Sequence, residues 1–304
     1  DLGDMEWTAI GMSSDLVFNG VYDGDYFTVY GLNASGETYS GLFGQVGASS
    51  SGRNAGVYNV IIKYGTSCSA TGVTGGAAAV LMNGASVDSC GIIGDLTGDT
   101  GVGGVVGIVR RSATISNSYY NGSISGNSKV GGILGTVESG TATIENCYHT
   151  GGIVTAEEHA GAIVGYVGGA ANIENSYYLN NNGDNAVDNT TFAGVTKVNS
   201  TVLKSLAVTL GDAYVDNVYE DYYNDGYPIF EGMMKYDGVP FVMGDIDFDN
   251  DFDVDDVILL QDYLLGRTKI TEEQFYAADV CTDGTVDCFD LCIMKRMLVE
   301  SEAT

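Results

Sequence analysis

Proline, tryptophan, histidine and positive charge are all scarce in this sequence. Its 304 residues include 2 prolines, 1 tryptophan, 2 histidines and only 12 lysines and arginines together. Against 40 aspartates and glutamates, this leaves a net charge of −28. So acidic a surface repels nucleic acid and anionic lipid but attracts divalent cations. We therefore expect no nucleic-acid partner.

Long hydrophobic runs are missing too, so we expect no membrane insertion. The chain begins at Asp1 without an initiator methionine, as a mature or trimmed chain would. Its six cysteines form no Cys-x-x-Cys pair, which argues against a zinc site.

Glycine is the abundant residue, with 44 copies, about twice its usual share. Because 44% of the residues are hydrophobic, a disordered chain is not expected. The composition instead indicates a fold with many tight corners. The length allows one large domain and a small one.

Apolar patches bounded by glycine or alanine recur through the first two thirds. They are Gly41–Gly44, Gly104–Gly107, Gly132–Gly135 and Ala162–Gly165, with a degenerate copy at Gly76–Ala79. Each is followed by a second patch, and these begin at Val57, Val87, Ile115, Ile144 and Ile173. Their starts lie 30, 28, 29 and 29 residues apart. Short strands at such a period predict a β-solenoid, because one unit cannot bury its own apolar face.

Aligning the second patches places like residues in columns. Cys90 and Cys147 fall in one column with small residues, and we expect them to be buried. Asn59, Asn117, Asn146 and Asn175 form a second column, predicted to hydrogen-bond along the solenoid. Tyr119, Tyr148 and Tyr177 form a third, which fits either packing between turns or a platform for stacking sugars.

These patches resemble the GLUG-type repeats of bacterial surface proteins over roughly residues 6–232. The resemblance implies an extracellular β-solenoid, and it implies no single activity. We assign this domain to residues 1–232. The stretch Asn180–Thr201 departs from the repeat and is interpreted as an irregular insertion or cap.

A different pattern begins at Gly244, where acidic residues alternate with apolar ones. Asp245, Asp247, Asp249, Asp251, Asp253 and Asp256 stand at positions 1, 3, 5, 7, 9 and 12 of an EF-hand loop. Ca²⁺ prefers six to eight hard oxygen ligands, and alternate residues of a tight loop can direct theirs to one centre. Position 7 is expected to ligate through its carbonyl, and position 9 through water. Asn250 holds position 6, where a left-handed backbone is needed.

A second loop begins 34 residues later. Asp279, Asp283, Thr285, Asp287 and Asp290 take positions 1, 5, 7, 9 and 12, and Gly284 supplies the turn. Position 3 is Cys281, whose sulfur is a poor ligand for a hard cation. We therefore expect two Ca²⁺ ions, with the second bound more weakly.

Each loop leads into a helical pattern, carried by Val257, Leu260 and Leu264 and then by Leu291 and Met294. Two loop-then-helix units resemble a type I-like cellulosomal dockerin, and Phe289–Arg296 is similar to dockerins of cellulolytic ruminal bacteria. The predicted fold is mainly β, a β-solenoid of 28–30-residue repeats followed by a small α dockerin. We assign the dockerin to residues 244–304, after a short linker at 233–243.

The dockerin resemblance implies a cohesin partner and a contact face. Carried over to this sequence, the family's contact positions are Val254, Asp255, Cys288, Phe289, Lys295 and Arg296. The two halves differ in charge and bulk at these positions. One binding orientation is therefore expected, with Phe289 as the apolar anchor.

The resemblance implies a secreted cellulosome component, attached to the cell surface through the cohesin of a scaffoldin or anchoring protein. For the solenoid three roles stay open: an accessory module for docking, a plant-polysaccharide-binding adhesin, or a β-helix polysaccharide-degrading enzyme. No catalytic residue is predicted, because no spacing of the histidines, Lys129 or the glutamates singles out a reactive pair.

Overall fold

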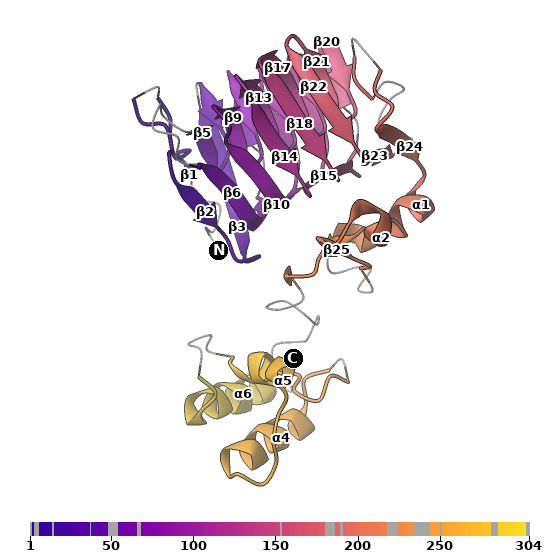
Figure 1. Ribbon diagram of the computed structural model, residues 1–304. Helices are drawn as coiled ribbons and strands as arrows, with labels where there is room; N and C mark the ends of the chain where they lie inside the picture. The colour runs from indigo at the N-terminus through magenta and orange to yellow at the C-terminus, as the bar shows by residue number, and fades with distance from the viewer. Residues whose placement is uncertain are drawn as a thin grey trace. The chain divides into compact units, whose positions relative to one another are not determined.

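The computed structural model describes residues 2, 6–13, 15–36, 38–47, 54–65, 68–152, 154–179, 186–188, 191–217, 224–233, 244–249, 251–280 and 285–301. The chain divides into two compact units, residues 1–233 and 234–304 (Figure 1). Each is described by itself. The proposed linker 233–243 lies, apart from Met233, outside the described residues.

The first unit is a β-solenoid, in which successive turns stack their strands in parallel (Figure 1). One face is a five-stranded sheet of β5 (Phe43–Gly47), β9 (Ala78–Met82), β13 (Val106–Arg110), β17 (Leu134–Ser139) and β21 (Val164–Val167). Each of these strands begins at the third residue of an apolar–glycine patch, and β9 begins in the degenerate copy.

The second face carries the second patches. Its strands are β2 (Val21–Asp23), β6 (Gly56–Tyr64), β10 (Ser86–Ile93), β14 (Ala113–Ser116), β15 (Tyr119–Asn121), β18 (Thr141–Glu145), β19 (Tyr148–His149), β22 (Ala170–Glu174), β23 (Ser176–Leu179) and β24 (Val195–Val198). Val57 pairs with Val87, Val87 with Ile115, Ile115 with Ile144 and Ile144 with Ile173. The register predicted from the spacing is therefore confirmed.

The third face completes each turn. Its strands are β3 (Thr28–Gly36), β4 (Tyr39–Ser40), β7 (Cys68–Ala70), β8 (Val73–Gly75), β11 (Leu96–Thr97), β12 (Thr100–Gly103), β16 (Ile124–Gly131) and β20 (Val154–Gly161), and β1 (Glu6–Trp7) pairs with β3. Glycine is required where this face turns into the first. A Cβ on Gly103 would lie 1.8 Å from the carbonyl oxygen of Val106, and one on Gly104 would meet the Tyr120 ring.

The interior of the solenoid is apolar and continuous between turns. Residues such as Val57, Val87, Ile115 and Ile144 are fully buried. Cys90 and Cys147 are fully buried, as expected, and they are free thiols. Burial raises the pKa of both thiols, that of Cys147 to about 12, so they remain protonated.

The asparagine column forms a bend on the second face. Asn59, Ser89, Asn117, Asn146 and Asn175 all have φ between 45° and 53°. Asparagine tolerates this left-handed backbone better than most residues. The Nδ2 of Asn175 donates to Oδ1 of Asn146 over 2.8 Å, and the Nδ2 of Asn146 donates to Oδ1 of Asn117 over 3.0 Å. The predicted ladder is confirmed for Asn117, Asn146 and Asn175, whereas the Nδ2 of Asn59 donates to Asp23. The backbone geometry explains why asparagine is suited to these positions.

The tyrosine column packs inside the protein and offers no sugar platform at its centre. Tyr119 and Tyr148 are fully buried, and their rings stack with centroids 5.2 Å apart. They are covered by a C-terminal cap of α1 (Ser200–Lys204), α2 (Ala207–Leu210), β25 (Tyr214–Val215) and β26 (Ile229–Phe230). Phe230 and Tyr214 contact the stacked rings. Of the two interpretations, packing is correct and the stacking platform is wrong.

The segment interpreted as an irregular insertion continues the solenoid in part. Within Asn180–Thr201, β24 pairs in parallel with β23, where Ser176 is opposite Val195. Val187 also forms a bridge with Val164. Ser176 and Val195 are 19 positions apart, and Val164 and Val187 are 23 apart. This last turn is therefore shorter than the 28–30-residue period, and a search for that period does not detect it.

In the part of the second unit that the structure describes, the helices are α4 (Val254–Leu264), α5 (Glu272–Ala278) and α6 (Cys288–Ser301). Val257, Leu260 and Met294 are buried with Ile246, Ala277 and Ala278 in a small core. The helices after both loops were predicted, but α5 was not. No helix in the described part of the chain has the length and apolar character needed to cross a membrane.

Candidate functional site

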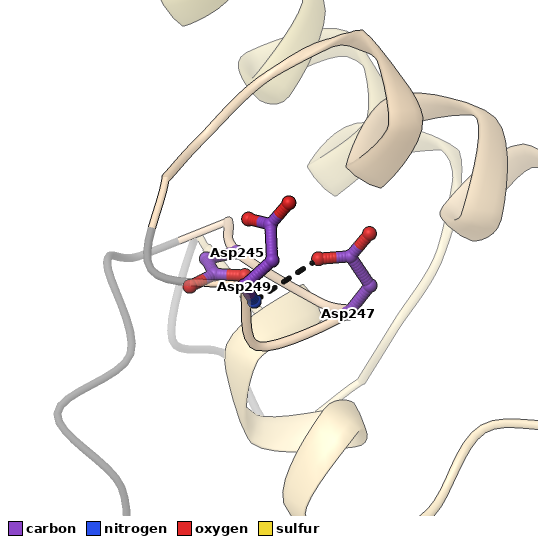
Figure 2. A group of neighbouring side chains, drawn as sticks. All are labelled: Asp245, Asp247 and Asp249. Carbon is purple, nitrogen blue, oxygen red and sulfur yellow. Dashed lines mark hydrogen bonds between the residues drawn. The ribbon is translucent and has the colours of Figure 1, made fainter.

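The first acidic loop brings three carboxylates together. One oxygen from each of Asp245, Asp247 and Asp249 lies within 4.8 Å of the others, and Figure 2 shows the three side chains around the loop. Two oxygens that bind one Ca²⁺ at about 2.3–2.6 Å can be no farther apart than about 5 Å. The spacing and the all-oxygen donor set therefore fit calcium.

Side-chain hydrogen bonds to the backbone hold this loop in shape. The carboxylate of Asp245 accepts from the backbone N–H of Phe248 over 2.8 Å, and that of Asp247 accepts from Asp249 over 3.2 Å. Phe248 has φ of 64°, the left-handed backbone of a tight turn. The loop is thus curled by its own aspartates, which is why acids at alternate positions converge on one side.

Asp256 joins the loop to the helix that follows. It is 1% exposed, and its Oδ1 accepts from the backbone N–H of Ile246 over 2.5 Å and of Asp247 over 3.2 Å. Its Oδ2 accepts from the N–H of Asp253, which completes a capping box at the start of α4. The side chain of Asp256, at position 12 of the loop, is thereby held against the backbone of Ile246 and Asp247, at positions 2 and 3.

The electrostatics of the loop favour a cation. Loss of hydration raises the pKa of Asp256 and Asp247 above the ordinary aspartate value. The neighbouring charge of Asp249 raises the pKa of Asp251 in the same direction. A divalent ion in the loop would favour the ionised forms of Asp247, Asp251 and Asp256.

The second loop repeats the local geometry of the first where the structure describes it. The carboxylate of Asp290, fully buried, accepts from the N–H of Asp287 over 2.9 Å, as Asp256 accepts from Asp253. The carboxylate of Asp287 accepts from Phe289, as that of Asp253 accepts from Asp255. Asn250, Cys281, Asp283 and Gly284 lie outside the described residues.

The predicted contact positions lie on the surface. Phe289 is 69% exposed and Val254 is 52% exposed. Asp255, Cys288, Lys295 and Arg296 are exposed as well. Val254 and Phe289 stand in the first turns of α4 and α6, where the last positions of each calcium loop are already helical.

Helix α5 supports the first loop, and sequence reasoning missed it. Thr271 and Gln274 form a capping box, in which Oγ1 of Thr271 accepts from the N–H of Gln274 over 3.2 Å. The Nε2 of Gln274 also donates to the carbonyl of Ile246 over 2.8 Å. The Thr-x-x-Gln spacing was the signal that could have revealed this helix.

Comparison with known proteins identifies this part of the chain. Residues 243–299 match the family model for the dockerin type I domain. The C-terminal unit is thus a dockerin type I domain, preceded by a β-solenoid of about five turns. Type I dockerins are non-catalytic modules that bind calcium in EF-hand-like loops and dock to cohesins in cellulosome-type assemblies.

The other comparisons add little. No curated protein sequence matches the chain. One solved structure, described as "a putative immunoglobulin A1 protease from Bacteroides ovatus", aligns with a TM-score of 0.46 and 21% identity, over 74% of this chain and 81% of that one. So distant a likeness says nothing about the chemistry of the solenoid.

Proposed function

We propose that this protein attaches its β-solenoid to a cohesin module of a scaffoldin or cell-surface anchoring protein through residues 244–304, in a calcium-dependent manner. The observation that carries the proposal is the convergence of Asp245, Asp247 and Asp249 within a segment that matches the dockerin type I domain. The protein would act outside the cell, where such assemblies operate.

Two Ca²⁺ ions are proposed, one in each loop. The first would be held by Asp245, Asp247, Asp249 and Asp256, with Asp251 contributing its carbonyl and Asp253 acting through water. The second would be held by Asp279, Asp283, Thr285, Asp287 and Asp290. It would bind more weakly, because Cys281 replaces an oxygen ligand.

Calcium would also stabilise the module. A core built on six fully or largely buried residues is small, and such small cores need a further stabilising element. At millimolar Ca²⁺ and a dissociation constant on the order of micromolar, each site adds about 4 kcal/mol to the free energy of unfolding. Docking and folding of this module are therefore expected to respond to calcium together.

The proposed contact face is asymmetric. Phe289, Lys295 and Arg296 present an exposed ring with two positive charges, whereas Val254 and Asp255 present a smaller side chain and a negative one. Phe289 and its basic neighbours would form the centre of the interface, because exposed aromatic and arginine side chains commonly dominate binding. A single orientation on the cohesin follows.

The solenoid, residues 1–232, is proposed to be the module that docking delivers. If the solenoid also binds polysaccharide as an adhesin, it cannot do so through Tyr119 and Tyr148, because both side chains are buried. The resemblance to GLUG-type repeats remains a prediction.

The test is calorimetric titration of the full chain with a panel of cohesins, in calcium and then in chelator. We expect one-to-one binding that chelator abolishes. Asp247→Asn should weaken binding, and Asp212→Asn is its control, because Asp212 is an exposed aspartate of the solenoid unit that lies outside both calcium loops. Binding that survives chelator, or no binding to any cohesin in calcium, would refute the proposal.

A further inference from the structure

The outward side of the second face carries two columns of polar residues before the asparagine bend. Ser86, Thr114, Thr143 and Asn172 pair in register on successive turns. Beside them, Asp88, Ser116, Glu145 and Glu174 pair in the same way. Neighbouring strands lie about 4.8 Å apart, so similar hydrogen-bonding groups repeat at that interval along the solenoid.

These columns end in a depression of about 700 Å³ near the last turns. Its lining includes Thr143, Glu145, Asn172, Glu174 and Phe192. Small-molecule sites commonly measure about 300–1,000 Å³, so the depression has room for a ligand. We call it the Phe192 trough, defined by these five residues.

The wall of the trough is built by the short last turn. The N–H of Ser176 donates to the carbonyl of Gly194 over 2.9 Å, which fixes the chain at the start of β23. A Cβ on Gly194 would lie 2.0 Å from the carbonyl oxygen of Ile173, so only glycine allows this approach. Phe192, two residues earlier, is half-buried against the core and also lines the trough.

The chemistry of the lining selects a ligand class. Carboxylates accept strong hydrogen bonds from hydroxyl groups, whereas the Asn172 amide and the Thr143 hydroxyl can both donate and accept. Phe192 adds an aromatic surface for an apolar face. No lysine or arginine is among the described lining residues, while two carboxylates are. An uncharged ligand rich in hydroxyl groups fits this set, and a polyanion does not.

We propose that the Phe192 trough binds a neutral oligosaccharide that lies along the solenoid axis. Glu145 and Glu174 would accept hydrogen bonds from successive sugar units, Asn172 and Thr143 would contact the same units from the side, and Phe192 would stack at one end. The columns of the preceding turns, with Ser116 and Thr114, extend the track beyond the trough. The buried tyrosine column lies past the asparagine bend and takes no part.

This inference is independent of docking, and the experiment separates the two. The full chain in calcium buffer is titrated by calorimetry with cellohexaose, xylohexaose and mannohexaose, and with a hexagalacturonate as the acidic probe. The same preparation is titrated with its cohesin. We expect at least one neutral hexasaccharide to bind and the hexagalacturonate not to bind.

Two variants of trough residues test whether the oligosaccharide binds in the Phe192 trough. Glu174→Gln and Phe192→Ala should each weaken binding about tenfold or more, the loss expected for one charge-assisted hydrogen bond or one stacking contact. Glu157→Gln is the matched control, because Glu157 is an equally exposed residue of β20 on another face. Glu174→Gln changes only a surface side chain and keeps the test valid should Phe192→Ala fail to fold.

Three results would overturn the proposal. They are failure of all three neutral hexasaccharides at millimolar concentration, neutral binding that both trough variants leave unchanged, and equal binding of the hexagalacturonate. Cohesin binding should be the same in all variants, so loss of sugar binding alone concerns only the trough.

Discussion

The ammonium group of Lys295 donates a hydrogen bond to the side-chain oxygen of Gln261 over 3.3 Å, although the two residues occupy equivalent positions of α6 and α4. They are 34 residues apart, the same interval that separates the two loops. The halves of the dockerin therefore meet at matching positions with different chemistry. Gln261 and Asp262 in one half correspond to Lys295 and Arg296 in the other.

This difference predicts that one half dominates cohesin binding. Phe289→Ala should lower cohesin affinity at least thirtyfold, about 2 kcal/mol, because it removes the most exposed apolar side chain next to a loop. Val254→Ala should have a smaller effect. Val299→Ala is the control, since Val299 is also 69% exposed on α6 but lies far along the helix. Calorimetric titration with the cohesin measures the affinity of each variant. Equal losses of affinity for Phe289→Ala and Val299→Ala would contradict the assignment of Phe289 as the main contact.

Chelation should unfold the dockerin and leave the solenoid folded. The loop carboxylates repel one another without a cation, whereas the solenoid core is a continuous apolar stack. Differential scanning calorimetry of the full chain should show two transitions, of which only one shifts with calcium. A far-UV circular dichroism spectrum that keeps all its helical signal in chelator would show that calcium is not needed for folding.

Substitution in the asparagine ladder should separate backbone strain from hydrogen bonding. Asn146 has φ of 53° and takes part in two ladder hydrogen bonds. Asn146→Ala should lower the free energy of unfolding by about 2–4 kcal/mol, because it loses both bonds and keeps an unfavourable backbone. Asn146→Gly should lose about 1–2 kcal/mol less, because glycine accepts this backbone. Urea unfolding of both variants measures the difference, and equal losses would mean that the backbone conformation contributes nothing.

The buried histidine predicts a pH dependence of solenoid stability. His149 is fully buried against the Tyr120 ring, and burial lowers its pKa from 6.5 to about 4. Between these values the unfolded chain binds a proton that the folded chain excludes, so stability falls as the pH drops from about 6.5 to about 4. The loss at the lower end is about 3 kcal/mol.

His149→Tyr is the matched variant for this test, because Tyr120 and Tyr178 stand opposite His149 on the neighbouring turns. Protonation of the carboxylates affects both proteins alike. Denaturant unfolding at pH 7 and pH 4 should therefore show a smaller drop for the variant. Identical pH profiles would mean that His149 does not limit stability in acid.

Much of the fold was determined by the sequence. The solenoid turn was visible because each turn must present apolar residues at the same positions, and the paired strands keep the intervals of 28–30 residues. The calcium loop was visible because Ca²⁺ ligands come from alternate residues of one short segment. Features of this kind can be predicted from the spacing of residue types along the sequence.

Contacts between distant segments were decided only by the tertiary structure. From the sequence, the Tyr148 column fitted both packing between turns, which was favoured, and a sugar platform. Phe230 and Tyr214, more than 60 residues later, pack with Tyr148 in one buried cluster and decide for packing. The Phe192 trough likewise depends on a last turn too short to follow the period. A repeat determines which residues align, but what lies over them depends on where the chain returns after the repeat ends.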